Sequence, residues 1–366
     1  MTFFNKYLKR PLSLLLALMM LFCICACGSA SDTDKDADKA KDPTKDEALS
    51  DNMGTVDVAP ENVIVPTNVK YRVGVILCSN DQEGFDAYYG FIETFRDHDT
   101  ENNGTHHEIH IANYESVEKC KEVVEEYIAG DVHLIFAVGK NAVLGASQAT
   151  TDIPIIFCNI DDPKELGLMT STVNPDKNIT GVSDLTPSQN QVEFIKELLP
   201  GAKKISALHY ATDANSILVS TLAQATAESL GLSYSSYSAN NKSQLAATLD
   251  KALSDTDVLY VCEDELTLAN MDAIMEAANK KNVPVISTGT KFMAKGALAT
   301  TQPDYYKLGY SAGELALICL MEIKPLSEIA VEYPVDCINY VNREIAEKYS
   351  VTPPENNFKY FGEEEQ

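Results

Sequence analysis

The sequence lacks the short motifs that mark most enzymes and metal proteins. It contains no GxSxG, HExxH or GxxxxGK[ST] pattern, and no glycine-rich dinucleotide fingerprint follows its first predicted strand. It has no CxxC pair and no cluster of cysteine with histidine, which argues against zinc. His209 ends a predicted strand without a nucleophile or base beside it, so we expect a hydrogen-bonding role there. We therefore expect no catalytic residue, no cofactor and no metal.

Positive charge is also scarce. The 366 residues include 29 Lys and Arg against 54 Asp and Glu, a formal net charge of −25. Nucleic acid and anionic membrane surfaces are therefore poor partners for this chain. The apolar fraction of 45% supplies ample material for a core, and the length favours two domains over one.

Only one apolar run is long, and it lies at the N-terminus. Lys6, Lys9 and Arg10 precede the run from Leu12 to Ala26, which is short for a membrane span but typical of a signal peptide. The run ends in ICACG and resembles a bacterial lipobox, in which Cys27 becomes the lipidated N-terminus. The alternative is an uncleaved N-terminal anchor. Either reading places the bulk of the chain outside the cytoplasm, and the first predicts a lipid anchor on the extracellular face of the cell membrane.

The remaining cysteines carry little information about function. They stand singly, mostly within apolar segments, where a cysteine behaves as a small apolar residue. Free thiols are our first reading and disulfides the alternative, since an exported protein can pair its thiols. These residues are Cys78, Cys120, Cys158, Cys262, Cys319 and Cys337.

Composition divides the mature chain into a linker and a globular part. Residues 27–66 are rich in Asp, Lys and Ala, which predicts a disordered acidic linker. From residue 70, short apolar runs alternate with amphipathic stretches as far as residue 159, and a second such series covers residues 188–287. A helical stretch follows at 303–323, then strands near 329–335 and at 337–341, then a helix at 342–349. Repeated strand–helix alternation indicates α/β lobes with parallel sheets covered by helices on both faces.

Polar residues that follow the predicted strands are the first candidates for a site, because ligands gather at the carboxyl ends of parallel strands. Several have a simpler alternative role: Asp264 can cap a helix, and Asn141 and Ser216 stand where helices begin. Aromatic residues could line a pocket or equally belong to an apolar helix face. They are Phe85, Tyr88, Tyr89, Tyr305 and Tyr306. The predicted ligand-binding residues are Ser79, Asn80, Phe85, Tyr88, Lys140, Asn141, Asn159, Asp161, Asn215, Ser216, Asp264 and Glu265.

Several segments together resemble the ABC transporter substrate-binding family that includes tryptophan- and tyrosine-type binding lipoproteins. The resemblance covers residues 70 to about 353 and rests on IPIIFCNIDDP (153–163), NITGVSD (178–184), ELLPGAKKISALHY (197–210), DANS (213–216), YVCED (260–264) and GALATTQPDYYKLGYSAGELA (296–316).

The resemblance implies the type I periplasmic-binding-protein fold, with two doubly wound parallel-sheet lobes joined by a hinge of three crossovers. The implied crossovers lie near Thr180–Thr186, near Ser287–Phe292 and after Leu320. Lobe 1 would comprise residues 67–183 and 291–322, and lobe 2 residues 184–290 and 323–353. Residues 354–366 would form an acidic tail.

The same resemblance implies a monomeric receptor that closes on a small solute and delivers it to ABC permease subunits. An amino acid, possibly aromatic, is the expected ligand. Asp264 would hold its amine, the helix starts at Asn141 and Ser216 would hold its carboxylate with Lys140, and Tyr88 would pack on its side chain. The sequence departs from the family pattern at two positions. Lys140 would add a charge for the ligand carboxylate or point to solvent, and the added acid Glu265 favours a more polar or basic ligand. A ligand-sensing module for a signalling partner and an extracellular enzyme are the alternatives.

Overall fold

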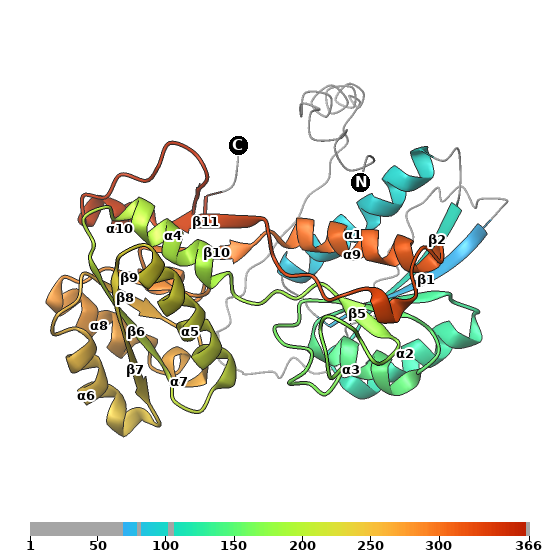
Figure 1. The fold of residues 1–366 in the computed structure, drawn as a ribbon, viewed down its shortest axis with the longest axis horizontal. Helices are drawn as coiled ribbons and strands as arrows, with labels where there is room; N and C mark the ends of the chain where they lie inside the picture. Colours follow the sequence, from blue (N-terminus) through green and yellow to red (C-terminus); the bar gives the residue numbers. More distant parts are fainter. Residues whose placement is uncertain (1–68, 79–81, 102–105, 364–366) are drawn as a thin grey trace, which may run out of the picture. The chain divides into compact units, whose positions relative to one another are not determined.

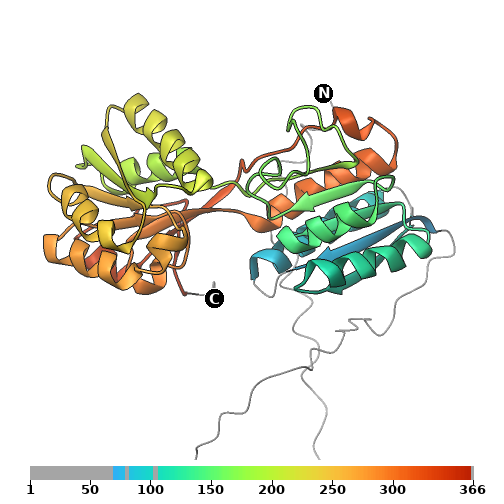
Figure 2. The same cartoon turned by 90° about the horizontal axis from the view of Figure 1, so that it is seen from below.

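The computed structural model describes residues 69–78, 82–101 and 106–363, which form two α/β lobes with separate sheets. Helices cover both faces of each sheet (Figure 2). This confirms the predicted fold class. The predicted signal peptide, Cys27, the linker 27–66, Ser79 and Asn80 lie outside the described residues.

Lobe 1 contains a five-stranded sheet in the order β2-β1-β3-β4-β5, and every pair of neighbouring strands is parallel. Its strands are β1 (Val69–Leu77), β2 (His106–Asn113), β3 (Leu134–Val138), β4 (Ile155–Cys158) and β5 (Ile179–Gly181). Its helices are α1 (Gln82–Glu101), α2 (Val117–Ala129), α3 (Lys140–Ala149) and α9 (Tyr305–Leu320). Helices α1 and α9 lie on one face of the sheet, and α2 and α3 lie on the other (Figure 1).

The period of two in strand β3 explains this layering. Leu134, Phe136 and Val138 belong to the cluster under α1 and α9, whereas Ile135 and Ala137 belong to the cluster over α2 and α3. All five side chains are fully buried. Because both faces of β3 are covered by helices, each of its positions favours an apolar residue, and the sequence of β3 is LIFAV.

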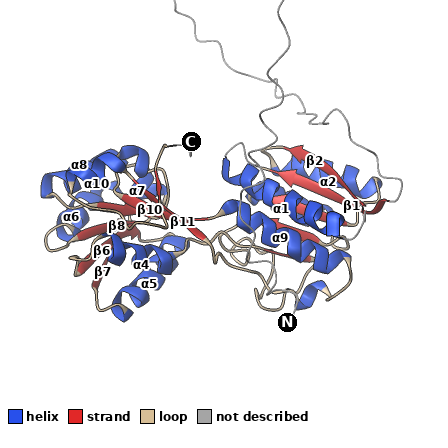
Figure 3. Cartoon of the chain, turned by 90° about the horizontal axis from the view of Figure 1, so that it is seen from above, coloured by secondary structure: helices blue, strands red, loops and turns tan. Residues whose placement is uncertain are grey.

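Lobe 2 contains a seven-stranded sheet in the order β12-β11-β10-β9-β8-β6-β7, whose strands appear in red in Figure 3. Its strands are β6 (Lys204–Tyr210), β7 (Ser233–Ala239), β8 (Val258–Val261), β9 (Val285–Ser287), β10 (Ala299–Pro303), β11 (Cys337–Val341) and β12 (Lys359–Tyr360). Its helices are α4 (Ser188–Leu198), α5 (Ala214–Ser229), α6 (Lys242–Ala252), α7 (Glu265–Leu268), α8 (Met271–Lys281) and α10 (Arg343–Lys348). Two 3₁₀ turns, η2 (Met293–Lys295) and η3 (Leu326–Glu328), complete the described elements.

The lobe boundaries differ from those expected from the sequence. Strand β10 pairs with β9 and β11 inside the second sheet, so the chain returns to lobe 1 at Asp304 and not near 287–292. Strand β11 is antiparallel to β10, so the second sheet is not parallel throughout. The segment 329–335 contributes only an isolated bridge from Glu332 to Val182. Strand β12 adds to the sheet a segment that the sequence analysis placed in the acidic tail.

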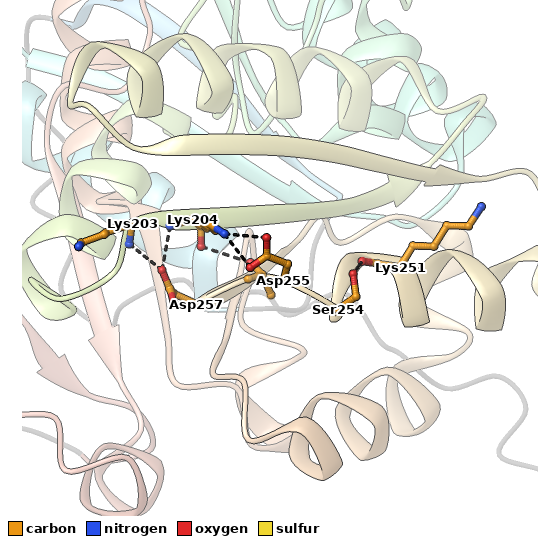
Figure 4. Close-up of polar contacts among 7 residues, drawn as sticks. Lys203, Lys204, Lys251, Ser254, Asp255 and Asp257 are labelled. Carbon is orange, nitrogen blue, oxygen red and sulfur yellow. Dashed lines mark hydrogen bonds and ion pairs between the residues drawn. The ribbon is translucent and has the colours of Figure 1, made fainter.

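Side chains also fix the amino end of strand β6 (Figure 4). Asp257 Oδ2 accepts hydrogen bonds from the backbone N–H groups of Lys203 and Lys204, at 2.8 and 3.0 Å. The Lys204 ammonium forms an ion pair with Asp255 at 2.6 Å, but both side chains are largely exposed, so this pair adds little stability. The backbone contacts to Asp257 are the ones that hold β6 beside the start of β8.

The described cysteines are all free thiols, in agreement with the first reading of the sequence. Among the described residues, no helix is long and apolar enough to cross a membrane.

Candidate functional site

A hollow of about 220 Å³ opens at the carboxyl ends of β4 and β5 in lobe 1. Three of the predicted site residues, Lys140, Asn159 and Asp161, line it. The rest of its lining comprises Ile160, Asp162, Glu165, Leu166 and Asp184. Four carboxylates and a single ammonium group therefore share this space, which is the arrangement of a site for a polar ligand with a positive group.

Two buried polar atoms at this hollow have no hydrogen-bond partner in the protein. They are Oδ1 of Asn159 and Oδ1 of Asp184. Asn159 follows β4 with φ = 58°, a left-handed conformation that asparagine tolerates better than most residues, and this turn directs the chain away from the strand. A buried acceptor without a donor is costly, so both atoms are suited to accept hydrogen bonds from a bound ligand.

Asp184 and Asp161 form an acidic pair. Burial, followed by the charge of Asp161, raises the pKa of Asp184 well above its usual range. Loss of hydration is also the largest cause of the raised pKa of Asp161, although the hydrogen bond with Asp184 opposes it. Two carboxylates this close resist simultaneous ionisation, so a cation between them would relieve their repulsion.

Hydrogen bonds hold the loops that carry this pair. Ser183 Oγ donates to the carbonyl oxygen of Asp161 at 2.7 Å, and the Ser183 N–H donates to the carbonyl oxygen of Glu332 at 2.8 Å. Asn215 Nδ2, at the start of α5, donates to Asp161 Oδ2 at 3.3 Å. Asn215, a fourth predicted residue, thus joins the group through Asp161.

The start of helix α3 favours an anion, whereas the acidic pair favours a cation. Its N-cap is Gly139, with φ = 88° and no side chain to accept from the first N–H groups of the helix. The positive end of the helix dipole is therefore available to an anion, and the Lys140 side chain lines the adjoining hollow. The Nδ2 group of Asn141 is already engaged, because it donates to the carbonyl oxygen of Glu115 at 2.7 Å.

The corresponding edge of lobe 2 is arranged differently. Asp264 is only 5% exposed, and its carboxylate already accepts three hydrogen bonds. Oδ2 accepts from the N–H of Tyr210 at 2.7 Å and from Oγ of Ser216 at 3.2 Å, and Oδ1 accepts from the N–H of Thr267 at 2.8 Å. The Thr267 hydroxyl accepts in turn from the Asp264 N–H, which completes a capping box at α7. The helix-capping role anticipated as an alternative for Asp264 is therefore present.

Ser216 and Glu265 do not line the lobe 1 hollow either. The Ser216 hydroxyl donates to Asp264, and its N–H donates to Asp213 Oδ1, so a side chain caps the start of α5. Glu265 lies in the first turn of α7 with an exposed side chain. Asp264 and Ser216 are thus brought together by the fold, but as a hydrogen-bonded structural pair.

The aromatic candidates pack against the core of lobe 1. Phe85 and Tyr88 on α1 are partly buried there, and burial raises the pKa of Tyr88. Tyr305, at the start of α9, packs against the same core. Its pKa is raised well above its usual range, first by burial and then by the charges of Asp184, Glu83 and Asp161.

Asp184 is missing from the set of residues predicted to bind ligand. Asp184 follows strand β5, whose three residues are too few to show a strand pattern. The segment NITGVSD nevertheless contains a pattern that could have identified Asp184, since apolar and small residues alternate and are followed by a carboxylate.

A second hollow, of about 260 Å³, lies between α4 and β11. Its lining includes Glu193, Glu197 and Asp336 but no cationic side chain, and none of its residues contributes a buried polar atom without a partner. The hollow in lobe 1 is therefore the better candidate for solute binding.

The fold and this site define a class of protein: two-lobed α/β receptors that hold a small polar solute at the carboxyl ends of their strands. The family model described as "ABC transporter substrate binding protein" matches residues 72–364, and the chain belongs to that family.

Individual relatives agree with this assignment. The tyrosine-binding protein of Clostridioides difficile strain R20291 is 31% identical over 211 residues. The match covers 58% of this chain and 61% of that relative.

Two solved structures also resemble the chain. One is a substrate-binding protein with adhesive properties from Clostridium difficile in its ligand-free, open form, with a TM-score of 0.68 and 25% identity, over 79% of this chain and 98% of that one. The other is an ABC domain from Streptococcus pneumonia in complex with L-Trp, with a TM-score of 0.55 and 25% identity, over 79% and 97% of the two chains.

Proposed function

We propose that this chain is the solute receptor of an ABC importer and that it binds a zwitterionic amino acid at the lobe 1 hollow. The observation that carries the proposal is the pairing of opposite charges within one site. Asp161 and Asp184 supply negative charge, and Lys140 lies with the uncapped start of α3 close by. An amino acid has the same pattern, an ammonium and a carboxylate on one carbon atom.

The two ends of the ligand take different partners. The ligand ammonium group donates to the carboxylates of Asp161 and Asp184 and to Oδ1 of Asn159. Asp184 and Asn159 each have a buried oxygen that accepts no hydrogen bond from the protein. The ligand carboxylate accepts from the first N–H groups of α3 and interacts with the Lys140 ammonium. Asp264 is not needed for either end, because three donors already occupy its oxygens.

Aromatic amino acids are the first ligands to test. One relative is named as a tyrosine-binding protein, and one similar solved structure is a complex with L-Trp. In this chain the charges of Asp184 and Asp161 help to raise the pKa of Tyr305, and we propose that Tyr305 supplies the aromatic surface for the ligand.

The test is a thermal-shift and calorimetric comparison of L-tyrosine with two analogues that each lack one end. Tyramine lacks the carboxylate, and 3-(4-hydroxyphenyl)propionate lacks the ammonium. We expect L-tyrosine or L-tryptophan to raise Tm and both analogues to bind much more weakly, with the ligand recovered unchanged. Equal binding of the analogue without the ammonium would contradict the assignment to Asp161 and Asp184. No shift with any amino acid would contradict the receptor proposal itself.

We also propose that Cys27 is lipidated and that the segment 27–66 tethers the receptor to the outer face of the cell membrane, within reach of its permease. The support is the lipobox-like ICACG sequence after the apolar run. Cys27→Ala should release the protein from the membrane fraction and leave its affinity for the solute unchanged. Retention of the variant in the membrane would instead favour an uncleaved N-terminal anchor.

A further inference from the structure

Lobe 1 contains a cluster of potential metal ligands far from the hollow. His98 and Asp99 lie near the carboxyl end of α1, and His107 is the second residue of β2. Their donor atoms all lie within 4.8 Å of one another. No sequence pattern reveals this group, because the connection between α1 and β2 separates His107 from the other two residues.

The distances within the cluster are close to those of a tetrahedral metal site. With metal–ligand bonds of about 2.0–2.2 Å, tetrahedral ligands lie about 3.3 Å apart. Asp99 Oδ1 lies 2.8 Å from Nδ1 of His107 and 3.8 Å from Nδ1 of His98. Small side-chain rotations would bring all three ligands to one ion.

Packing restricts the position of the His107 ring. Tyr71 on β1 stacks on the ring with centroids 5.7 Å apart, and Phe95 on α1 meets it edge-on at 4.6 Å. The His107 side chain is only 1% exposed, whereas those of His98 and Asp99 are 19% and 26% exposed. An ion can therefore reach the cluster from the side of α1.

We propose that His98, Asp99 and His107 bind a divalent transition-metal ion of the zinc type. Two imidazoles and one carboxylate suit Zn²⁺, and they suit Mg²⁺ and Ca²⁺ poorly because those ions prefer oxygen ligands. Three protein ligands leave a fourth position for water. Bound metal would fasten the last turn of α1 to the start of β2.

The alternative is a simple hydrogen bond from His107 to Asp99 that joins helix to strand. His98 distinguishes the two readings, because the hydrogen bond does not involve it. The cluster lies at the amino end of β2, whereas the hollow lies at the carboxyl ends of β4 and β5. Metal binding can therefore be tested independently of solute binding, and its failure would leave the proposed function untouched.

The experiment is calorimetry with Zn²⁺ on protein purified without a histidine tag, with no solute present. We expect one saturable site in the wild type and affinity at least about tenfold weaker in His98→Gln. His110→Gln is the matched control, since His110 lies on the same strand and its side chain is exposed. It should bind as the wild type does. Mg²⁺ should give no saturable binding.

Co²⁺ absorption is a second measurement, and it would not change in His98→Gln if His98 had only a structural role. Co²⁺ bound at the cluster should give the intense visible absorption of tetrahedral coordination, and His98→Gln should lose it. The same Zn²⁺ affinity in wild type and His98→Gln, or no saturable binding at all, would overturn the proposal. His98 is partly exposed, so this variant should fold even where His107→Gln does not.

Discussion

The carboxyl-end edges of the two lobes contain similar residues used in opposite ways. In lobe 1, Asn159 and Asp184 carry buried oxygens without partners beside an uncapped helix. In lobe 2, three donors meet Asp264, and Asp213 caps the adjacent helix. Only Oδ1 of Asn215 is a buried oxygen without a partner among the lobe 2 residues named here. A buried carboxylate that accepts hydrogen bonds from several protein donors contributes to stability. A buried carboxylate oxygen without a protein donor is available to a ligand. The comparison indicates that lobe 1 supplies most of the polar recognition.

The largest expected effect is the loss of stability in Asp264→Ala. Removal of a buried carboxylate leaves three donors without an acceptor and breaks the capping box, which should lower the free energy of unfolding by about 3 kcal/mol. Urea denaturation measures this change. Glu265→Ala is the matched control, because the neighbouring side chain is exposed, and it should be nearly neutral. Similar stability of the two variants would remove the contrast between the lobes.

Asp161→Asn should mainly affect ligand binding. Loss of one charge-assisted hydrogen bond to the ligand ammonium should weaken affinity about 10–100-fold, which corresponds to about 1.4–2.8 kcal/mol. Calorimetry with the best amino acid measures the change, and the exposed Asp255→Asn serves as a charge-matched control. An unchanged affinity in Asp161→Asn would remove this residue from the site.

Asp184→Asn should stabilise the ligand-free protein while it weakens binding. The folded state raises the pKa of Asp184, so its charged form costs stability that its protonated form does not. The free energy of unfolding of the wild type should therefore fall relative to that of Asp184→Asn as pH rises from the unfolded pKa to the raised folded pKa. The difference should reach about 1.4 kcal/mol for each unit by which the pKa is raised. Urea unfolding between pH 4 and pH 8 measures it, and a pH-independent difference would contradict the assigned cause.

Lys140→Gln should have the smallest effect, a few-fold loss of affinity worth about 1 kcal/mol or less, because the α3 backbone remains in place. The loss should appear with L-tyrosine and vanish with tyramine, which has no carboxylate for Lys140 to meet. An equal loss with both ligands would show that Lys140 acts on the site as a whole.

Much of the fold follows from the local pattern of the sequence. Helix α4 (188–198) begins the second series where the sequence predicts it, and the alternation that predicts β1 to β4 and β6 to β9 is present. Strand β10 cannot be predicted from an apolar run, because Thr300, Thr301 and Gln302 are polar. They are nevertheless buried, in a strand that lies between two others. Strand β12 has only two residues and depends on pairing with β11, which no local signal reveals.

Part of the site can also be predicted from the sequence. Lys140, Asn159 and Asp161 follow from the rule that ligands gather at strand ends, and the structure brings them together. The proximity of Asp184 and Tyr305 to Asp161 depends on β5 and α9, which are distant in sequence. For Asp264, helix capping was the predicted alternative to ligand binding, and the structure shows the capping box.

The most direct test is a crystal structure of the protein with its amino acid ligand. The predicted result places the ligand nitrogen within about 3 Å of a carboxylate oxygen of Asp161 or Asp184, with the ligand carboxylate at the start of α3. A ligand nitrogen bonded to Asp264 or Glu265, with the lobe 1 hollow unused, would contradict the account.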